Sequence, residues 1–567
     1  LTGSPVAGVG PQDVALAIIK AVFDNGYVKN KVMEFVGPGI ANLSADFRMG
    51  VDVMTTETTC LSSIWKTDSK VEEWYSVHGR PEAYKELAPQ DGAYYDGAIE
   101  INLDEIRPMI ALPFHPSCAY TIDEVNANLL DLLAETEKRA KVSFGDKVNY
   151  SLKNKVIDGK LYVDQGVIAG CAGGGFENIC AAADILKGKD TGNGKFLLNV
   201  YPASMPVYQE LMKNGAFTSL VSAGAIIKTA FCGPCFGAGD TPANGAFSIR
   251  HSTRNFPNRE GSKIQNGQLS SVALMDARSI AATAANKGFL TADTEFSGKK
   301  YFFDKAIYDK RVYDSKGVAH PEVEIQFGPN IKDWPEQKAL DQDLLIKVVS
   351  EIHDPVTTTD ELIPSGETSS FRSNPLGLAE FTLSRKDPAY VARAKAVRDA
   401  VNYIDDMPSA SKDILEEIEQ VQFIIEKEYP EFKGRIHLNT TKGSTIFACK
   451  PGDGSAREQA ASCQRVLGAC ANIANEYATK RYRSNLINWG MLPFIYKEGD
   501  KNLPFENDDY IYIPYVRKMI EDKLPSITAY SVKKDGKVNK FELSVGELTD
   551  DERKIILAVC LINFYKE

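Results

Sequence analysis

The chain has 567 residues, a length that predicts about three to four domains at roughly 150 residues each. Its formal net charge of −11 argues against a general nucleic-acid or anionic-membrane binder, because such proteins usually present a net basic surface. No apolar run approaches the ~20 residues needed to span a bilayer, and the ten cysteines are too sparse for a secreted disulfide framework. We expect a protein of a reducing compartment, the cytoplasm or alternatively the mitochondrial matrix, with no membrane partner.

The first residues predict a turn followed by a helix. Pro11 precedes Gln12 and Asp13, and apolar residues at helical spacing come next. A carboxylate in the first turn suits the helix dipole. Because residue 1 is Leu rather than Met, and the first segment already has the pattern of a strand end, a turn and a helix, we expect the chain to be processed or cut from something longer.

Two short strands are predicted in the first part of the chain, at residues 32–36 and 97–103. Three prolines between Pro108 and Pro116 then indicate a change of domain. The first predicted domain therefore covers residues 1–112.

Residues 113–293 form the second predicted domain, in which short apolar strands alternate with helices. The strands are predicted at residues 166–168, 196–200 and 225–227, and the helices at 179–186 and 206–214. Such alternation predicts a parallel α/β sheet, with ligands at the carboxyl ends of its strands. Residues 294–342 show no sustained periodicity of apolar residues, which predicts a linker. The predicted strand DLLIKVVS then begins a last domain at residues 343–567.

A Cys-x-x-Cys motif follows the third of those strands. Cys232 and Cys235 in FCGPCFGAGD place two thiols on one tight turn, which suits zinc, an iron–sulfur cluster or dithiol redox chemistry. The alternative is a pair of buried or incidental thiols without a function.

Cys171 lies where an apolar strand ends, a glycine run turns the chain and a helix begins, in VIAGCAGGGFENICAAADIL. Glycines there allow backbone N–H groups to point at an anionic ligand near a helix N-terminus. Taken alone, this loop is better explained as a plain glycine-rich turn around a core cysteine. Because both cysteine loops follow strands of one sheet, we expect them to meet at the same edge.

The three cysteines suggest a cluster with an open coordination position. A structural zinc site normally has four protein ligands, and no fourth Cys or His lies at close ligand spacing to either loop. Electron-transfer clusters usually take four cysteines as well. Three ligands leave one iron open, and an open iron is a Lewis acid that can hold a hydroxyl and a carboxylate.

Arginines follow the motif in HSTRNFPNREG, where Arg254 and Arg259 flank a Phe-Pro turn. Guanidinium groups match carboxylates bidentately, so this pair beside a metal loop suits a di- or tricarboxylate. The alternative is a solvated basic loop.

The last domain contains PGDGSAREQAASCQRV, with Ser455, Arg457 and Glu458. Ser455 and Glu458 have the spacing of a capping box at a helix start. A Gly-Ser-x-Arg turn at a helix N-terminus also presents a hydroxyl and a guanidinium to an anion, and composition alone leaves both interpretations open.

Seven segments of the chain resemble the aconitase family of iron–sulfur hydro-lyases, in the family's order. They are LTGSPVAGVGPQDV, VMEFVGPGI, YDGAIEINLDEIRP, CGPCFG, RNFPNR, TTDELIPSG and GSARE. The resemblance implies an α/β fold of aconitase-like domains with parallel or mixed sheets, followed by a C-terminal swivelling domain.

The resemblance also assigns roles to residues. It implies a [4Fe-4S] cluster with the metal ligands Cys171, Cys232 and Cys235, and substrate carboxylates bound by Arg254, Arg259, Arg372 and Arg457. Ser455 would be the catalytic base, helped by the arginines and helix terminus around it. Asp52 stands where the family has a Glu near the substrate hydroxyl.

Other departures leave the substrate open. Arg48 and Thr253 stand where the family has two Asn residues, one of which touches the cluster, and Ala456 replaces the serine after the catalytic one. Typical aconitases also have an N-terminal domain whose His–Asp pairs protonate the leaving hydroxyl, whereas the adjacent pair of this chain, His353–Asp354, lies in the last domain. We expect that N-terminal domain to be a separate or cleaved partner, or else this chain alone not to be a competent dehydratase.

The predicted reaction is the reversible dehydration and rehydration of a small, citrate-like hydroxy polycarboxylate. One alternative is a hydro-lyase for another acid of the homoaconitate, methylcitrate or isopropylmalate type, which Asp52 and Ala456 favour. A second alternative is a non-catalytic iron- or redox-sensing protein that binds RNA, which the net charge disfavours.

Overall fold

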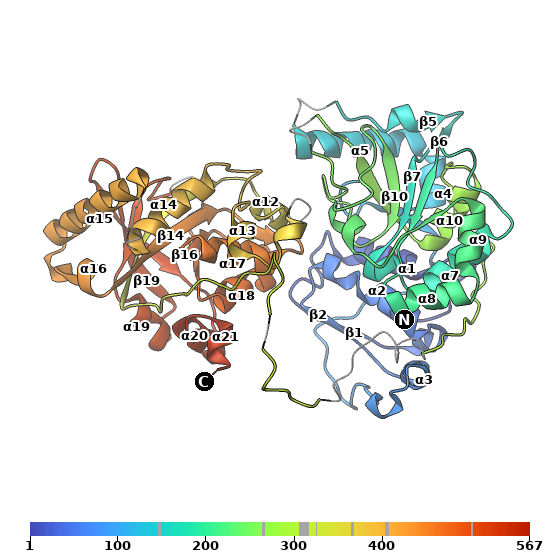
Figure 1. Ribbon diagram of the computed structural model, residues 1–567, viewed down its shortest axis with the longest axis horizontal. Helices are drawn as coiled ribbons and strands as arrows, with labels where there is room; N and C mark the ends of the chain where they lie inside the picture. Colours follow the sequence, from blue (N-terminus) through green and yellow to red (C-terminus); the bar gives the residue numbers. More distant parts are fainter. Residues whose placement is uncertain are drawn as a thin grey trace. The chain divides into compact units, whose positions relative to one another are not determined.

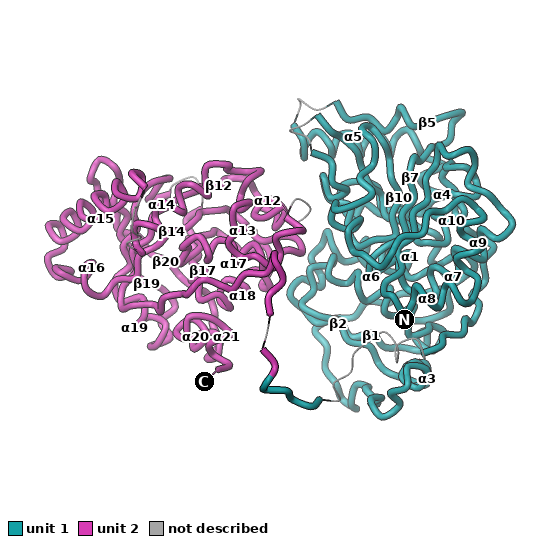
Figure 2. Tube along the Cα trace, in the orientation of Figure 1, with its two compact units in different colours: residues 1–322 teal, residues 323–567 magenta. Residues whose placement is uncertain are grey.

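The structure is a computed structural model that describes residues 1–145, 149–263, 267–305, 317–324, 326–364, 368–402, 408–499 and 503–566. The chain divides into two compact units, Leu1–Glu322 and Val323–Glu567 (Figure 2). The finer division of the first unit near residue 112 stays a prediction.

A seven-stranded sheet forms the centre of the first unit, in the order β4-β3-β11-β10-β7-β8-β9. Its strands are β3 (Met109–Ala111), β4 (Ala119–Thr121), β7 (Gln165–Ile168), β8 (Leu197–Val200), β9 (Ile226–Ile227), β10 (Phe247–His251) and β11 (Ser271–Met275). The five strands from β11 to β9 pair in parallel, whereas β3 and β4 add antiparallel at one edge. The predicted parallel α/β sheet is confirmed.

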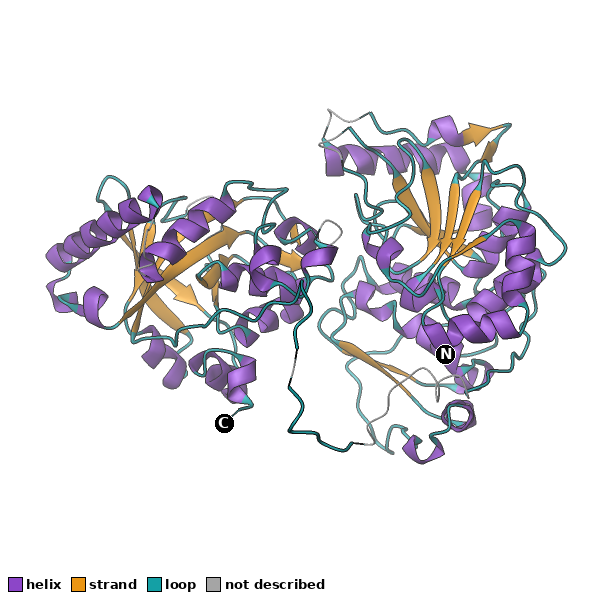
Figure 3. Ribbon diagram, viewed as in Figure 1, coloured by secondary structure: helices purple, strands orange, loops and turns teal. Residues whose placement is uncertain are grey.

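Figures 1 and 3 show the helices of the first unit, most of which flank this sheet, whereas α3 lies away from it. They are α1 (Pro11–Val22), α2 (Ala45–Asp52), α3 (Ser69–Val77), α4 (Ile122–Ala127), α5 (Leu129–Phe144), α6 (Gly170–Gly173), α7 (Phe176–Leu186), α8 (Met205–Lys213), α9 (Ala216–Ala223) and α10 (Ala277–Ala285). Alternation along β11 separates two cores: Ala273 and Met275 pack with residues of α7 and α10, whereas Val272 and Leu274 pack with residues of α1. Both faces of the sheet are therefore buried.

The predictions for residues 1–112 have mixed outcomes. The helix at Pro11 is α1, and the strand at residues 32–36 is β1 (Val32–Phe35), which pairs in parallel with β2 (Ser62–Trp65). The strand predicted at residues 97–103 is wrong, because this stretch forms a single bridge between Thr2 and Asn102. The Asn102 side chain accepts a hydrogen bond from the backbone of Asp104 and starts a 3-10 turn, which competes with a strand ladder.

The second unit is built around a closed barrel, in the order β12-β14-β16-β17-β20-β19-β18. Its strands are β12 (Asp343–Ile352), β14 (Thr440–Ala448), β16 (Ala469–Ala474), β17 (Leu492–Ile495), β18 (Tyr510–Ile513), β19 (Ser526–Val532) and β20 (Val538–Ser544). The strands β12, β14, β16 and β17 pair in parallel, and antiparallel pairs close the barrel. The predicted strand DLLIKVVS is confirmed as part of β12.

Helices surround the barrel. They are α12 (Thr359–Leu362), α13 (Pro375–Ala379), α14 (Tyr390–Asn402), α15 (Ser409–Glu428), α16 (Arg435–Leu438), α17 (Arg457–Val466), α18 (Lys480–Asn488), α19 (Val516–Glu521), α20 (Asp550–Leu557) and α21 (Leu561–Phe564). The strand β12 shows why they are needed: Leu344 and Ile346 pack in one apolar cluster, and Leu345 and Val349 pack in another. A strand that is apolar on both faces needs a core on each side.

The predicted linker, residues 294–342, contains no helix or strand among its described residues; residues 306–316 and 325 lie outside them. Within the described ranges, no helix combines the length and apolar character that a bilayer crossing requires.

Candidate active site

Cys171 lies at the carboxyl end of strand β7, in the one-turn helix α6. Gly170 before it has a φ of +70°, and a Cβ at this position would lie 2.6 Å from Sγ of Cys235. A Cβ at Gly173 would lie 2.4 Å from the carbonyl oxygen of His251. Both glycines are therefore needed for this turn to pack, which explains the glycine run in the sequence.

Cys232 and Cys235 lie in the loop after β9, around the 3-10 helix η6 (Gly233–Phe236). The backbone N–H of Cys235 donates to the carbonyl of Cys232 at 3.0 Å and closes the turn. Cys235 is buried, whereas Cys232 and Cys171 are exposed. The two loops follow β7 and β9, parallel strands of one sheet with β8 between them, and they meet as the sequence predicts, since Sγ of Cys235 faces Gly170.

The three thiols influence one another's ionisation. Burial, and then the charge of Cys232, raises the pKa of Cys171. A hydrogen bond with Cys232, burial, and the charges of Cys232 and Cys171 raise the pKa of Cys235. Three thiolates so close together repel one another and need a bound cation. The donor set and its glycine cradle fit a metal centre or cluster, although within the described ranges no three His, Cys, Asp or Glu side chains already have metal-ligating geometry.

Arg250 holds the Cys232–Cys235 loop in place, and the sequence analysis missed it. This arginine lies on β10 and is only 1% exposed. Its guanidinium donates to the carbonyls of Pro234 at 2.6 Å and Asp240 at 2.7 Å, and to Oε1 of Gln165 at 3.3 Å. An arginine within the apolar strand AFSIRH is the signal that could have revealed it, because a buried guanidinium requires such partners.

Arg254 and Arg259 lie beside the cysteine loops. Nε of Arg259 donates to the carbonyl of Cys235 at 2.9 Å. Arg254 forms an ion pair with Glu57 at 2.6 Å, and its positive charge acts on the Cys171 thiol. Their side chains are largely buried, so the alternative of a solvated basic loop is wrong.

Asp52 is the last residue of α2, and its carboxylate is held by two donors. The hydroxyl of Ser63 donates to Oδ1 at 2.6 Å, and Nε1 of Trp65 donates to the same oxygen at 2.8 Å. Arg48, one turn earlier, is 3% exposed and pairs with Asp68, the N-cap of α3, at 2.6 Å. Arg48 therefore joins α2 to α3 instead of presenting a free polar group.

Two carboxyl groups, those of Asp46 and Glu177, lie close together where α7 begins after the glycine run that follows Cys171. The hydroxyl of Ser44 donates to Oε2 of Glu177 at 2.6 Å, and the backbone N–H of Glu177 donates to Oδ2 of Asp46 at 2.9 Å. Burial and then the charge of Asp46 raise the pKa of Glu177 to about 7. Burial also raises the pKa of Asp46. The pair is therefore destabilising when both carboxyls are ionised.

This pair predicts a pH-dependent effect of Glu177→Gln. A carboxyl whose pKa is higher in the folded state binds more protons there, so the wild-type protein loses stability as the pH rises from the unfolded value of about 4.5 to about 7. Each pKa unit corresponds to about 1.4 kcal/mol. The variant should gain at most about 3 kcal/mol relative to wild type at pH 8 and little at pH 4. The free energies of unfolding of both proteins, measured at pH 4 and pH 8, test this prediction. An equal difference between variant and wild type at the two pH values would contradict it.

In the second unit, Ser455 follows the short strand β15 (Pro451–Asp453), which pairs in parallel with β13 (Thr357–Thr358). Gly454 has a φ of +124°, and a Cβ there would lie 2.3 Å from Oγ1 of Thr359. The same Thr359 oxygen accepts a hydrogen bond from the backbone of Ala456 at 3.3 Å. Thr359 therefore fixes the turn that carries Ser455.

The capping box considered for Ser455 is wrong. The helix α17 begins at Arg457, so Ala456 is its N-cap and makes no side-chain capping bond. Glu458 instead accepts a hydrogen bond from Nε1 of Trp489 at 3.0 Å. Ser455 thus precedes the helix and is partly exposed beside its N-terminus, next to Arg457.

Arg372 is exposed and ends the 3-10 helix η8 (Ser369–Phe371). Ser365 and Gly366 of TTDELIPSG lie outside the described residues. His353 bonds to Glu351 at 2.6 Å, and Asp354 pairs with Lys386 at 2.9 Å. The first unit therefore brings together the three cysteines with Arg254 and Arg259, while Arg372, Ser455 and Arg457 belong to the second unit.

Residues 1–282 match the model of the aconitase family (aconitate hydratase), and residues 410–499 match that of the aconitase C-terminal domain. Together the two matches cover more than half of the chain. The chain belongs to the aconitase family. The first match contains all three cysteines with Arg254 and Arg259, and the second contains Ser455 and Arg457.

Curated aconitase-family relatives match about half of the chain. The 3-isopropylmalate dehydratase large subunit of Caldicellulosiruptor bescii is 29% identical over 300 residues, which are 53% of this chain and 60% of that protein. The 2,3-dimethylmalate dehydratase large subunit of Eubacterium barkeri is 30% identical over 262 residues, which are 46% of this chain and 54% of that protein. The chain thus spans about three fifths of the length of these relatives.

Among solved structures, 3-isopropylmalate dehydratase from Methanocaldococcus jannaschii matches 39% of this chain and 93% of that one. The sequence identity is 20% and the TM-score is 0.23, which is too low to support an argument from shape.

Proposed function

We propose that this aconitase-family protein is a hydro-lyase that removes and adds water on a small hydroxy polycarboxylate, with a [4Fe-4S] cluster held by Cys171, Cys232 and Cys235. The observation that carries the proposal is the meeting of these three thiols with two arginines, Arg254 and Arg259, in one unit. A site with thiolates for a cluster and guanidinium groups for carboxylates suits this reaction class.

When bound, the cluster supplies a Lewis-acidic iron that polarises the oxygens of the substrate. The side chains of the protein do the remaining work. Arg254 and Arg259 bind and orient carboxylates, and the ion pair with Glu57 and the bond to the Cys235 carbonyl fix their positions. Asp52, held by two donors through Oδ1, is proposed to act near the substrate hydroxyl.

Ser455 is proposed to take the proton from the substrate carbon during dehydration and to return it during hydration. A serine hydroxyl is a poor base by itself, so its alkoxide needs electrostatic stabilisation. Arg457 and the N-terminus of α17 are adjacent to Ser455 on the same turn and supply positive charge. Arg372 and Arg457 are proposed to complete the set of carboxylate-binding groups.

The relatives favour a branched malate over citrate as the substrate, because their names specify 3-isopropylmalate and 2,3-dimethylmalate. We therefore propose an acid of this type, in place of the citrate-like acid expected from the sequence. Those relatives are named as large subunits, which supports a second polypeptide in the active assembly.

A substrate panel tests this choice. The natively purified assembly, with its cluster intact, is assayed with 3-isopropylmalate, 2,3-dimethylmalate, citrate and homocitrate by the absorbance of the unsaturated product. We expect kcat/KM for a branched malate to exceed that for citrate by at least about tenfold, since one well-placed apolar group contributes about 1–3 kcal/mol. Faster turnover of citrate would restore the citrate-like assignment, and no turnover of any acid would contradict the hydro-lyase proposal.

A further inference from the structure

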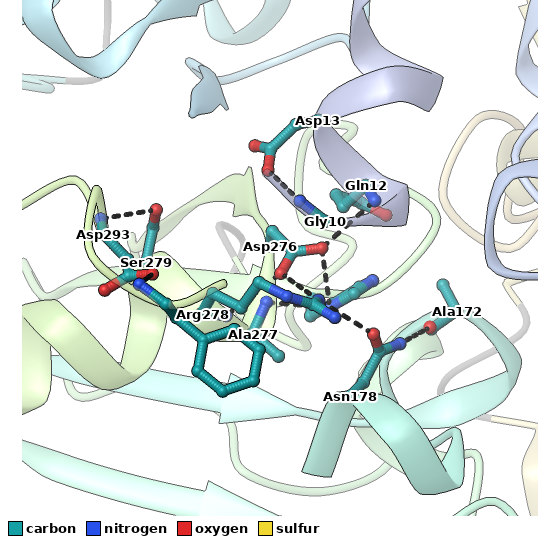
Figure 4. Close-up of polar contacts among 12 residues, drawn as sticks. Gly10, Gln12, Asp13, Ala172, Asn178, Asp276, Ala277, Arg278, Ser279 and Asp293 are labelled. Carbon is teal, nitrogen blue, oxygen red and sulfur yellow. Dashed lines mark hydrogen bonds and ion pairs between the residues drawn. The ribbon is translucent and has the colours of Figure 1, made fainter. Parts of the chain in front are cut away.

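A buried polar network lies behind the Cys171 turn in the first unit (Figure 4). We define the Asp276 network as Gln12, Asn178, Asp276 and Arg278, and all four side chains are less than 10% exposed. Asp276 is the N-cap of α10 and is completely buried. Its carboxylate is the point from which two branches of hydrogen bonds run.

The first branch leads to the turn that carries Cys171. Nη1 of Arg278 lies 2.9 Å from Oδ1 of Asp276 and donates to Oδ1 of Asn178 at 3.2 Å. Nδ2 of Asn178 then donates to the carbonyl of Ala172 at 3.0 Å. Ala172 directly follows Cys171, so this bond fixes the peptide next to the cysteine.

The second branch leads to the turn that carries Arg254. The backbone N–H of Gln12 donates to Oδ2 of Asp276 at 3.2 Å, and Nε2 of Gln12 donates to the carbonyl of Ser252 at 2.9 Å. Ser252 lies two residues before Arg254. One carboxylate therefore joins a cysteine turn and an arginine turn that are 80 residues apart in the chain.

The local packing makes this junction stiff. A Cβ at Gly10 would lie 2.2 Å from Oδ2 of Asp276, so the start of α1 approaches the carboxylate as closely as a glycine allows. Asp13, in the first turn of α1, accepts from the backbone of Gly10 at 2.8 Å and of Met109 at 2.7 Å, which anchors the same helix end to β3. The buried carboxylate of Asp276 is compensated by Arg278.

We propose that Asn178 is a positioning residue for the cluster, and that the Asp276 network sets the position of the Cys171 turn relative to the Arg254 turn. The role assigned to these two turns rests on the proposed function. The hydrogen bonds themselves do not, and so the network can be tested in the protein without its cluster.

The test is Asn178→Asp, which keeps the size of the side chain and an acceptor for Arg278 but places a carboxylate oxygen against the Ala172 carbonyl. Thr283→Val is the matched control, because Thr283 is a buried polar residue on α10 that bonds to the Thr291 carbonyl outside the network. The readout is the rate of iodoacetamide alkylation of Cys171 relative to Cys232 in the cluster-free protein, measured by peptide mass spectrometry.

We expect Asn178→Asp to change the Cys171-to-Cys232 ratio by about fivefold, the factor that corresponds to one buried hydrogen bond, and Thr283→Val to leave the ratio unchanged. In the reconstituted protein, Asn178→Asp should also lose iron to a chelator faster than the control. An unchanged ratio, or an equal change at both cysteines, would overturn the proposal.

If Asn178→Asp does not fold, Asn178→Ser takes its place, since it removes both bonds without adding charge. Failure of both variants to fold beside a folded Thr283→Val would show that the network holds the fold and not the turn, which would also overturn the proposal. The proposed function and the role of the network can fail separately. If the wild-type protein binds no iron while Asn178→Asp still changes the alkylation ratio, the proposed function is refuted and the role of the network is supported.

Discussion

Replacing Cys235 by serine is expected to remove the cluster. Cys235 is the buried member of the three thiols, and its sulfur lies against Gly170 at the start of the Cys171 turn. Serine has nearly the same size but does not supply a thiolate, which is the ligand that iron–sulfur clusters require. After anaerobic reconstitution, iron should fall from about four atoms per chain to less than about one, with loss of the visible absorbance.

Cys180→Ser is the control for this experiment. Cys180 is also buried, lies on α7 in the same unit, and accepts a hydrogen bond from Nδ2 of Asn214 at 3.4 Å. Its replacement should leave the iron content unchanged, since its thiol belongs to the helix packing. Unchanged iron in Cys235→Ser would refute the ligand assignment.

Replacing Ser455 by alanine is expected to lower kcat by about 10²–10⁴-fold, the usual contribution of a positioned acid or base. The cluster should remain, because Ser455 lies in the second unit and the three cysteines lie in the first. The turn should also remain, because Thr359, together with Gly452 in β15 and Gly454 directly after it, fixes the backbone there. The measurement combines steady-state kinetics with iron content.

Ser462→Ala serves as the matched variant, since Ser462 is a buried serine on α17, the helix that follows Ser455. It should retain near-wild-type kcat. Near-wild-type activity of Ser455→Ala would rule out the role of this serine as the base, and equal losses in the two variants would indicate a general disturbance of α17.

Local patterns predicted much of the first unit. The helix at Pro11, the alternation of strands and helices after residue 160 and the two cysteine loops all depend on periodicity, glycine and proline, which act over a few residues. The strand predicted at residues 97–103 failed because the Asn102 side chain accepts a hydrogen bond from the backbone N–H of Asp104. A hydrophobic pattern does not reveal that competition.

Contacts between residues far apart in the chain could not be predicted from the local sequence patterns. The barrel of the second unit closes through pairs such as β12 with β18, whose residues are more than 150 positions apart. Arg250 supports the Cys232–Cys235 loop by donating hydrogen bonds to backbone carbonyls, and Arg48 forms an ion pair with Asp68. Such partners depend on the folded packing, so residue type and spacing alone could not identify them.

The most direct test of the central claim is the Mössbauer spectrum of the reconstituted wild-type protein, recorded before and after addition of 3-isopropylmalate. Three cysteine ligands leave one iron of the cluster without a protein thiolate. We therefore predict that the signal of one iron shifts on addition of the acid while the others stay unchanged. A spectrum that shows four equivalent thiolate-bound irons, or that does not respond to any hydroxy acid of the panel, would contradict the account.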